Sequence, residues 1–249
     1  MVTRTYQERF KTLQGVFDNH TERNLFELES HKVFDELISP LKVGKESNVF
    51  LAKKRSAGNE EYVIVKIYRV QNCDFKRMFE YIRKDPRYMF LKQKRREIIF
   101  SWTQREYRNL IAAAKAGVNV PKAISWRSHI LVEELIGEPA PPLKDLPPKN
   151  PKKFFALVIE EVKKLYQGGL IHGDLSAFNI LNDHEKPYLI DFSQATVTKT
   201  PNSEELLERD IKNICQFFKK LGVKADAEEI KQEIIKLEPK TINRYNKKE

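Results

Sequence analysis

The sequence contains very little cysteine: Cys73 and Cys215 are the only two in 249 residues, and they lie far apart. Two distant thiols exclude a disulfide scaffold and a cysteine-rich zinc module, because both need several cysteines at short spacing. The chain also lacks an apolar run of membrane-spanning length, and its start, MVTRTYQERF, contains no apolar signal segment. These absences predict a soluble, cytoplasmic protein with reduced thiols and no membrane partner.

Acidic residues are outnumbered, with 35 against 45 basic residues, so the formal net charge is +10. This excess favours polyanionic partners such as nucleotides, RNA or an acidic surface, and it is equally compatible with a solvated basic face. Hydrophobic residues make up 41% of the chain and include 15 phenylalanines. The length and the apolar content therefore suit one large domain or two small lobes, each with a core.

The apolar periodicity changes along the chain and predicts a mixed α+β architecture. Residues 5–38 have the spacing of helices, as Phe10, Leu13 and Phe17 illustrate. Alternating apolar residues predict a hairpin in LKVGKESNVFLAKKR, and EYVIVKIYRV (61–70) is a strongly β-prone run. The pattern then predicts a helix over 97–117, strands over 130–132 and 187–191, and helices over 150–167, over 203–222 and up to about 237.

Two segments stand out by composition. Residues 137–148 are rich in glycine and proline and are the best lobe boundary in the sequence. The predicted domains are therefore an N-terminal helical extension (1–39), an N-terminal lobe (40–136) and a C-terminal lobe (137–249). Residues 72–96 mix aromatic residues with many cations, and we expect a mobile surface segment there.

Lys66 lies in the middle of the apolar run EYVIVKIYRV. An unpaired buried ammonium group is expensive, so Lys66 needs an acidic partner or an anionic ligand. Glu106, on the following helix in QREYRNL, can supply that partner. Taken alone, the simpler explanation is a lysine on an edge strand whose ammonium group reaches water.

The stretch LIHGDLSAFNILND (170–183) places polar side chains among apolar ones. A turn with Gly173 and Asp174 would explain it, and so would a catalytic loop. The hairpin expected in NILNDHEKPYLI could bring Asp191, at the end of PYLID, back to Asp174 and Asn179. Oxygens from Asn179 and Asp191 would suit Mg²⁺, and Asp174 would then serve as a base or orienting group. A strand lysine, a helix glutamate, H-x-D-x-x-x-x-N and D-F-x occur in the order that kinases use for phosphoryl transfer.

From roughly residue 40 to residue 220, the sequence resembles the RIO family of atypical protein kinases. VGKESNVF is similar to the shortened phosphate loop of the family, and VKIY and WTQREYRNL resemble the segments with the strand lysine and the helix glutamate. HGDLSAFN and IDFSQ resemble its catalytic and metal motifs, and LLERDIKNICQFF resembles the helix that follows. Ser176 and Ser193 match the first RIO subfamily better than the second.

The resemblance implies a bilobal protein-kinase-like fold with a β-rich N-lobe, extra N-terminal helices over it and a helical C-lobe. It implies ATP and Mg²⁺, with Mn²⁺ as an alternative, and a serine/threonine protein kinase or ATPase that autophosphorylates. It also implies a role in maturation of the small ribosomal subunit, with the subunit precursor and its RNA as partners; we do not expect DNA binding.

The resemblance also assigns roles to residues. Lys66 would hold the α and β phosphates and Glu106 would hold Lys66, while Asp174 would be the catalytic base. Asn179 and Asp191 would hold the metal, and Asp191 would thereby take part in catalysis. The remaining ATP-binding residues implied are Gly44, Lys45, Glu46, Ser47 and Val49 at the phosphate turn, and Glu134 and Ile136, whose backbone would face adenine.

The sequence departs from ordinary protein kinases in ways that leave alternatives open. Gly173 stands where most protein kinases have arginine, Ser193 replaces the glycine after Asp-Phe, and no A-P-E motif follows. We therefore expect neither an activation segment nor the usual peptide-docking helices. A nucleotide-sensing module that binds ribosomal RNA with little turnover, and a small-molecule or tRNA-modification-associated kinase, are the competing hypotheses. The cations of residues 74–96, among them Arg87, Lys92, Lys94 and Arg95, are predicted to contact RNA.

Overall fold

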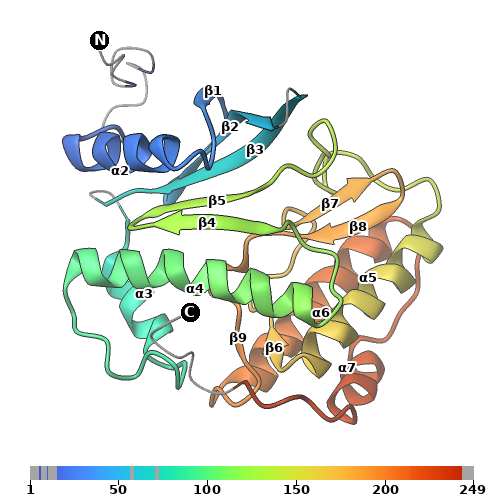
Figure 1. Cartoon of the computed structure of the whole chain (residues 1–249). Helices are drawn as coiled ribbons and strands as arrows, with labels where there is room; N and C mark the ends of the chain where they lie inside the picture. The colour runs from blue at the N-terminus through green and yellow to red at the C-terminus, as the bar shows by residue number, and fades with distance from the viewer. Residues whose placement is uncertain (1–5, 7–9, 11–15, 57–58, 71–72, 243–249) are drawn as a thin grey trace. The chain divides into compact units, whose positions relative to one another are not determined.

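The computed structural model describes residue 6, residue 10 and the ranges 16–56, 59–70 and 73–242 (Figure 1). The chain divides into two compact units. The first takes in Met1–Phe79, Lys92–Tyr107 and Ala123–Leu135, and the second takes in Glu80–Leu91, Arg108–Lys122 and Ile136–Glu249. The helix α4 (Arg95–Lys115) therefore contributes its first part to one unit and its last part to the other.

The first unit contains a five-stranded antiparallel sheet with the strand order β1-β2-β3-β5-β4. The strands are β1 (Glu36–Val43), β2 (Ser47–Ser56), β3 (Asn59–Tyr68), β4 (Ala123–Arg127) and β5 (Ile130–Glu134). The predicted β1–β2 hairpin is confirmed, and so is the strand in EYVIVKIYRV. Every residue of β3 from Val63 to Tyr68 is buried, and β2 and β5 flank this strand on both sides.

Helix α2 (Asn19–Ser30) covers the sheet of the first unit (Figure 1), and its Leu25 and Leu28 join a core with Phe50 and Val65 of the strands. The Asp18 side chain caps the helix by accepting a hydrogen bond from the Thr21 N–H at 2.8 Å. The helical spacing at the N-terminus is inferred from Phe10, Leu13 and Phe17. Leu13 lies outside the described residues.

The prediction of helix up to residue 38 is wrong. Helix α2 ends at Ser30, where the Val33 N–H bonds to the Leu28 carbonyl at 3.0 Å and Lys32 takes a left-handed conformation with φ 58°. This is a Schellman termination, which usually has glycine at the left-handed position. Because lysine occupies that position here, the sequence carries no stop signal, and β1 begins only six residues after the helix ends, at Glu36.

The expectation of a mobile surface segment over 72–96 is also wrong for the part that the structure describes. Helix α3 (Phe75–Ile82) buries Met78, Phe79 and Ile82, three apolar side chains that lie on one face at helical spacing. Beyond the helix, the Asp85 side chain is fully buried as well. The many cations of the segment conceal this apolar stripe in the sequence.

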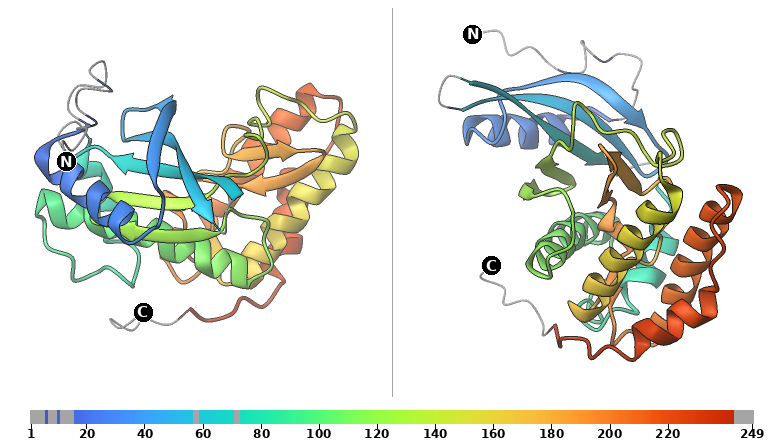
Figure 2. Two further views of the ribbon diagram at one scale, coloured as in Figure 1. Left: turned by 45° about the horizontal axis from the view of Figure 1, so that its top comes forward. Right: turned by 90° about the vertical axis from the view of Figure 1, so that its right-hand side faces the viewer.

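The second unit is mainly helical, with α5 (Pro151–Gln167), α6 (Ser203–Lys220) and α7 (Ala227–Ile235). The ribbons of Figure 2 show the helices of this unit. Helices α5 and α6 pack through Phe155 and Phe218, whose ring centroids are 5.2 Å apart. The predicted Asn150 cap of α5 is confirmed, with its side chain accepting from the Lys153 N–H at 3.0 Å. None of the helices that the structure describes is long and apolar enough to cross a membrane.

Two short two-stranded ladders complete the second unit. One joins β6 (Leu170–Ile171) to β9 (Thr196–Val197), and the other is the predicted hairpin of β7 (Ile180–Asp183) and β8 (Lys186–Leu189). The 3₁₀ turn η1 (Phe192–Gln194) lies between β8 and β9. Together the two ladders hold the loop between β6 and β7 and the loop between β8 and β9, where the polar residues of the sequence motifs lie.

Candidate active site

Lys66 lies in a central strand of the first unit and forms a buried ion pair. Its Nζ is 2.8 Å from Oε1 of Glu106 on α4, and the two side chains are 8% and 1% exposed. The hydroxyl of Tyr68 donates a hydrogen bond to the other oxygen of Glu106. The explanation by an edge-strand lysine is therefore excluded, because β3 is flanked by two strands and the ammonium group has its acidic partner inside the protein.

The residues predicted for the phosphate turn lie in and just after the turn that joins β1 to β2, beside the Lys66 strand. The Gly44 N–H bonds to the Ser47 carbonyl at 3.0 Å, and a Cβ on Gly44 would lie 2.7 Å from that carbonyl oxygen. Only glycine fits this turn without a shift of the backbone. Val49 follows in β2 and pairs directly with Lys66. Lys45 and Glu46 are exposed at the tip of the turn.

The two residues predicted to face adenine lie where the chain leaves the first unit. Glu134 is the last residue of β5, and Ile136 is the first residue assigned to the second unit. The first unit therefore holds the predicted ATP-binding residues from Gly44 to Glu134. Asp174, Asn179 and Asp191 all belong to the second unit.

Hydrogen bonds within the second unit bring the loop after β6 together with the loop after β8. The Asn179 side-chain N–H donates to the Asp174 carbonyl at 2.9 Å. The Asn179 carbonyl accepts from the Ile190 N–H at 3.0 Å, and the His172 ring nitrogen lies 3.0 Å from the Ile190 carbonyl. The expected convergence of the Asp174–Asn179 loop with Asp191 is therefore present in the structure.

Asp191 itself has an unusual backbone conformation. Its φ and ψ angles are 63° and 67°, in the left-handed region that residues with a Cβ rarely adopt. The hydroxyl of Ser193 donates a hydrogen bond to the Asp191 carboxylate at 2.8 Å. Such a conformation persists only where its surroundings fix it, and it is typical of functional sites.

The Asp174 loop is bound from outside by helix α6. Asp210 accepts hydrogen bonds from the Gly173 N–H at 2.7 Å and from the Leu175 N–H at 2.8 Å. Arg209 donates to the Gly173 carbonyl, and Asn213 donates to the Leu175 carbonyl at 3.1 Å. Burial raises the pKa of Asp210 to about 7, although the two backbone N–H donors oppose the rise.

Sequence reasoning missed these three polar residues of α6. The only signal is their placement: Asp210 is flanked by Leu207, Ile211 and Ile214, so a carboxylate occupies the buried face of an amphipathic helix. A buried carboxylate needs hydrogen-bond donors, and here the loop backbone supplies them. Gly173, which donates one of these bonds, lies 37 positions earlier in the chain, and nothing in the sequence identifies it.

The donor set of the second unit fits a hard divalent cation. The Asn179 amide uses its N–H on the Asp174 carbonyl, which leaves the amide oxygen as the group able to ligate. Asp191 adds a carboxylate from the adjoining loop. In the part of the chain that the structure describes, no group of three histidine, cysteine, aspartate or glutamate residues could hold a metal ion by itself. One carboxylate and one amide, completed by phosphate oxygens and water, match the preference of Mg²⁺.

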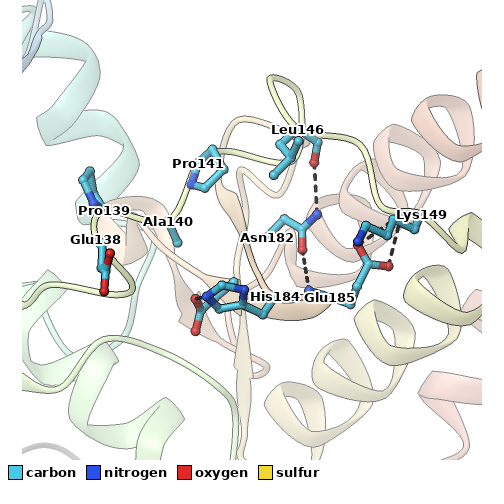
Figure 3. Close-up of a pocket in the computed structure, with 10 residues that line it drawn as sticks. Glu138, Pro139, Ala140, Pro141, Leu146, Lys149, Asn182, His184 and Glu185 are labelled. Atoms are coloured by element: carbon cyan, nitrogen blue, oxygen red, sulfur yellow. Dashed lines mark hydrogen bonds and ion pairs between the residues drawn. The ribbon is translucent and has the colours of Figure 1, made fainter.

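A cavity of about 460 Å³ lies elsewhere in the second unit, beside the turn of the β7–β8 hairpin (Figure 3). Asn182 links two of the segments that line this cavity, because it donates to the Leu146 carbonyl at 3.1 Å and accepts from the Glu185 N–H at 3.0 Å. None of the predicted site residues lines this cavity. It is therefore distinct from the loops that carry Asp174 and Asp191.

Residues 48–231 match the model of the RIO domain family. The chain belongs to the RIO family. The RIO-type serine/threonine-protein kinase Rio1 of Methanocaldococcus jannaschii is 43% identical over 88% of this chain and 76% of its own length. Its counterpart from Haloferax volcanii is 35% identical, covering 90% of this chain and 77% of the relative. Human serine/threonine-protein kinase RIO1 is 33% identical over 85% of this chain, which spans only 38% of the human protein.

The fold of a RIO kinase is confirmed by solved structures. The Rio2 kinase from Chaetomium thermophilum, in a complex described as ADP/Mg²⁺-phosphoaspartate, superposes with a TM-score of 0.66 at 24% identity. The alignment covers 85% of this chain and 65% of the Rio2 chain. The predicted α+β kinase-like architecture is therefore confirmed, and the chain is placed among the RIO-type serine/threonine-protein kinases.

Proposed function

We propose that this RIO protein is an ATP- and Mg²⁺-dependent serine/threonine kinase or ATPase of the first RIO subfamily that autophosphorylates. The observation that carries the proposal is the joining of the Asp174–Asn179 loop to the Asp191 loop by backbone and side-chain hydrogen bonds. The buried Lys66–Glu106 pair supplies the second element that phosphoryl transfer requires. Names of the relatives support the subfamily, since the archaeal and human proteins are called Rio1.

Each residue has a defined role in this proposal. Lys66, oriented by Glu106, neutralises the α and β phosphates, and the Gly44–Ser47 turn with Val49 encloses them. Glu134 and Ile136 offer backbone groups to adenine. Asp174 accepts the proton of the attacking hydroxyl or water. Asn179 and Asp191 bind Mg²⁺ or Mn²⁺, which when bound neutralises the phosphate oxygens.

We further propose that the partner is a precursor of the small ribosomal subunit, bound through its RNA. The net charge of +10 supports a polyanionic partner. Exposed cations occur in α3 and in the residues that follow it, namely Lys76, Arg77, Arg83, Lys84, Lys92, Lys94, Arg95 and Arg96. Arg87 does not belong to this group, because its side chain is 3% exposed and forms an ion pair with Asp85.

The test is turnover of labelled ATP by the purified chain, with and without small-subunit particles, followed by mass spectrometry of the protein. The proposal expects phosphoserine or phosphothreonine on the chain, or a hydroxylamine-labile acyl phosphate if the ATPase dominates. Excess EDTA should abolish turnover, and Mg²⁺ should restore it. Nucleotide binding without a single turnover would favour the RNA-binding module instead, and transfer to an aminoglycoside or choline would favour the small-molecule kinase.

A further inference from the structure

A buried polar network occupies the second unit next to the loop that follows Asp191. Arg87 donates to Asp85 through Nε at 2.9 Å and through its terminal nitrogen at 2.6 Å. The other terminal nitrogen of Arg87 donates to the Asn109 amide oxygen at 2.9 Å. Asp85 and Asn109 are fully buried. The Arg87–Asp85 ion pair is expensive to bury. We therefore expect it to fix the position of neighbouring groups in addition to any effect on stability.

The network ends on the backbone of residues 192–196. The Asn109 side-chain N–H group donates to the Phe192 carbonyl at 3.1 Å and to the Ala195 carbonyl at 2.7 Å. The Tyr81 hydroxyl donates to the Gln194 carbonyl at 2.9 Å, and the Thr196 hydroxyl donates to Asp85 at 3.2 Å. Three carbonyl groups and one side chain of the five residues after Asp191 are therefore bound by this network.

Arg87 determines which way the Asn109 amide faces. The guanidinium group can only donate, so the amide oxygen must point toward it and the amide N–H group must point toward the two carbonyls. Apolar packing could fill the same volume, but it would remove the side-chain donor from both carbonyls and leave the Phe192 carbonyl with only its bond from the Ala195 N–H at 3.1 Å. The network thus fixes the peptide units on the C-terminal side of Asp191, while the Ile190–Asn179 bond fixes the N-terminal side.

We propose that Asn109, oriented by Arg87 and Asp85, is a positioning residue that holds Asp191 in its left-handed conformation and thereby sets the affinity for the divalent cation. The inference rests on the proposed role of Asp191 as a metal ligand. Asn109 does not touch the cation: it acts through the Phe192 and Ala195 carbonyls. Residues that orient a metal ligand in this way commonly change metal affinity about 10- to 100-fold when they are replaced.

The experiment measures Mn²⁺ binding by electron paramagnetic resonance in the presence of ADP, together with the Mg²⁺ concentration that gives half-maximal turnover. Asn109→Ala removes the side-chain donor to both carbonyls, and the Mn²⁺ Kd should rise about tenfold or more. Tyr81→Phe removes one hydroxyl and keeps the ring, so the Kd should rise about threefold, as expected for one hydrogen bond. Tyr166→Phe, on α5, is the matched control and should leave the Kd unchanged.

A merely structural role predicts a different result. Loss of stability lowers the folded fraction and the maximal rate, but it does not change the Kd of the molecules that remain folded. If Asn109→Ala does not fold, Tyr81→Phe decides the matter, and an unchanged Mn²⁺ Kd in the folded variants would overturn the inference. Asp191→Ala separates the two proposals: if this variant binds Mn²⁺ as tightly as the parent chain, the metal site itself is misassigned.

Discussion

The hydroxyl oxygen of Tyr81 lies 2.7 Å from the position that a Cβ atom would occupy on Gly173, and the Gln194 carbonyl oxygen lies 2.9 Å from the same position. Gly173 also has a φ angle of +75°. Most protein kinases have an arginine where this chain has Gly173. Here the Tyr81 hydroxyl and the Gln194 carbonyl occupy the space that a side chain at this position would need. An arginine at this position would therefore require a shift of the Gln194 backbone in addition to a left-handed conformation.

Gly173→Ala tests this explanation. The left-handed conformation and the contact with Gln194 should together cost about 2–4 kcal/mol of the free energy of unfolding. Turnover should fall about tenfold or more, because Asp174 is the next residue. Gly222→Ala is the matched control: Gly222 has a similar φ of +84°, but no atom of the described residues lies within 4 Å of its Cβ position. Equal losses of stability and activity in the two variants would contradict the steric explanation.

Lys66→Ala and Asp174→Asn should separate nucleotide binding from chemistry. Removing the ammonium group of Lys66 should weaken ATP binding and leave the Glu106 carboxylate buried without its cation. Asp174→Asn should bind ATP normally and lower turnover about 100-fold, the contribution of one general base. Isothermal titration calorimetry and steady-state kinetics measure the two effects. Asp145→Asn, an exposed position, is the control, and full activity in Asp174→Asn would refute the assignment.

The stability of the first unit should depend on pH through His129. This ring is 1% exposed, lies 2.9 Å from the Thr21 hydroxyl and stacks on His20. Burial first, and then the nearby His20 and Arg96, lower the pKa of His129 to about 4, while Asp18 opposes the shift. Because the unfolded chain binds the proton more tightly, stability is complete above about pH 6.5 and is lost as the pH falls toward 4.

Urea unfolding at pH 7 and pH 5 measures this dependence. The parent chain should lose about 2 kcal/mol through His129 between these two values, and His129→Asn should lose correspondingly less. His184→Asn is the control, since the His184 side chain is 96% exposed and its left-handed backbone suits asparagine. The same pH dependence in His129→Asn and the parent chain would show that another group is responsible.

RNA binding should depend on the exposed cations around α3 and not on Arg87. Replacing Lys76, Arg77, Lys92 and Lys94 with alanine should weaken binding to small-subunit RNA, and each lost phosphate contact should reduce the log–log salt slope by about 0.7 for single strands. Basal ATP turnover should stay close to that of the parent chain. The control removes four exposed lysines elsewhere, Lys152, Lys219, Lys220 and Lys224. If both variants show the same salt slope, only the net charge matters.

Local patterns in the sequence predicted much of the fold and of the contacts at the site. The Lys66 strand, the Glu106 helix and the hairpin that returns Asp191 to Asn179 all follow from apolar periodicity and short loops, because each depends on neighbours in the chain. The ion pair between Lys66 and Glu106 follows from the cost of burying a lone ammonium group. The roles of these residues toward ATP and metal stay predictions.

Features that depend on distant partners could not be predicted. Lys32 ends α2 in a conformation that lysine seldom adopts, so no glycine marks the end. Asp85 and Arg87 look like ordinary surface charges in a basic segment, yet both are buried because Asn109 and Thr196 meet them from elsewhere in the chain. A single sequence shows which residues are polar, but not which of them will meet after folding.

The binding of the Gly173 and Leu175 backbone by Asp210 has a consequence for synthesis. Chains begin to fold from the N-terminus while they are still being made. A nascent chain that has not yet extended beyond Asn202 already carries Asp174, Asn179 and Asp191, but it lacks α6 and therefore the groups that hold their loop. The side chains proposed for catalysis thus acquire their geometry late, because their loop gains its bonds to Asp210 only after α6 has been synthesised.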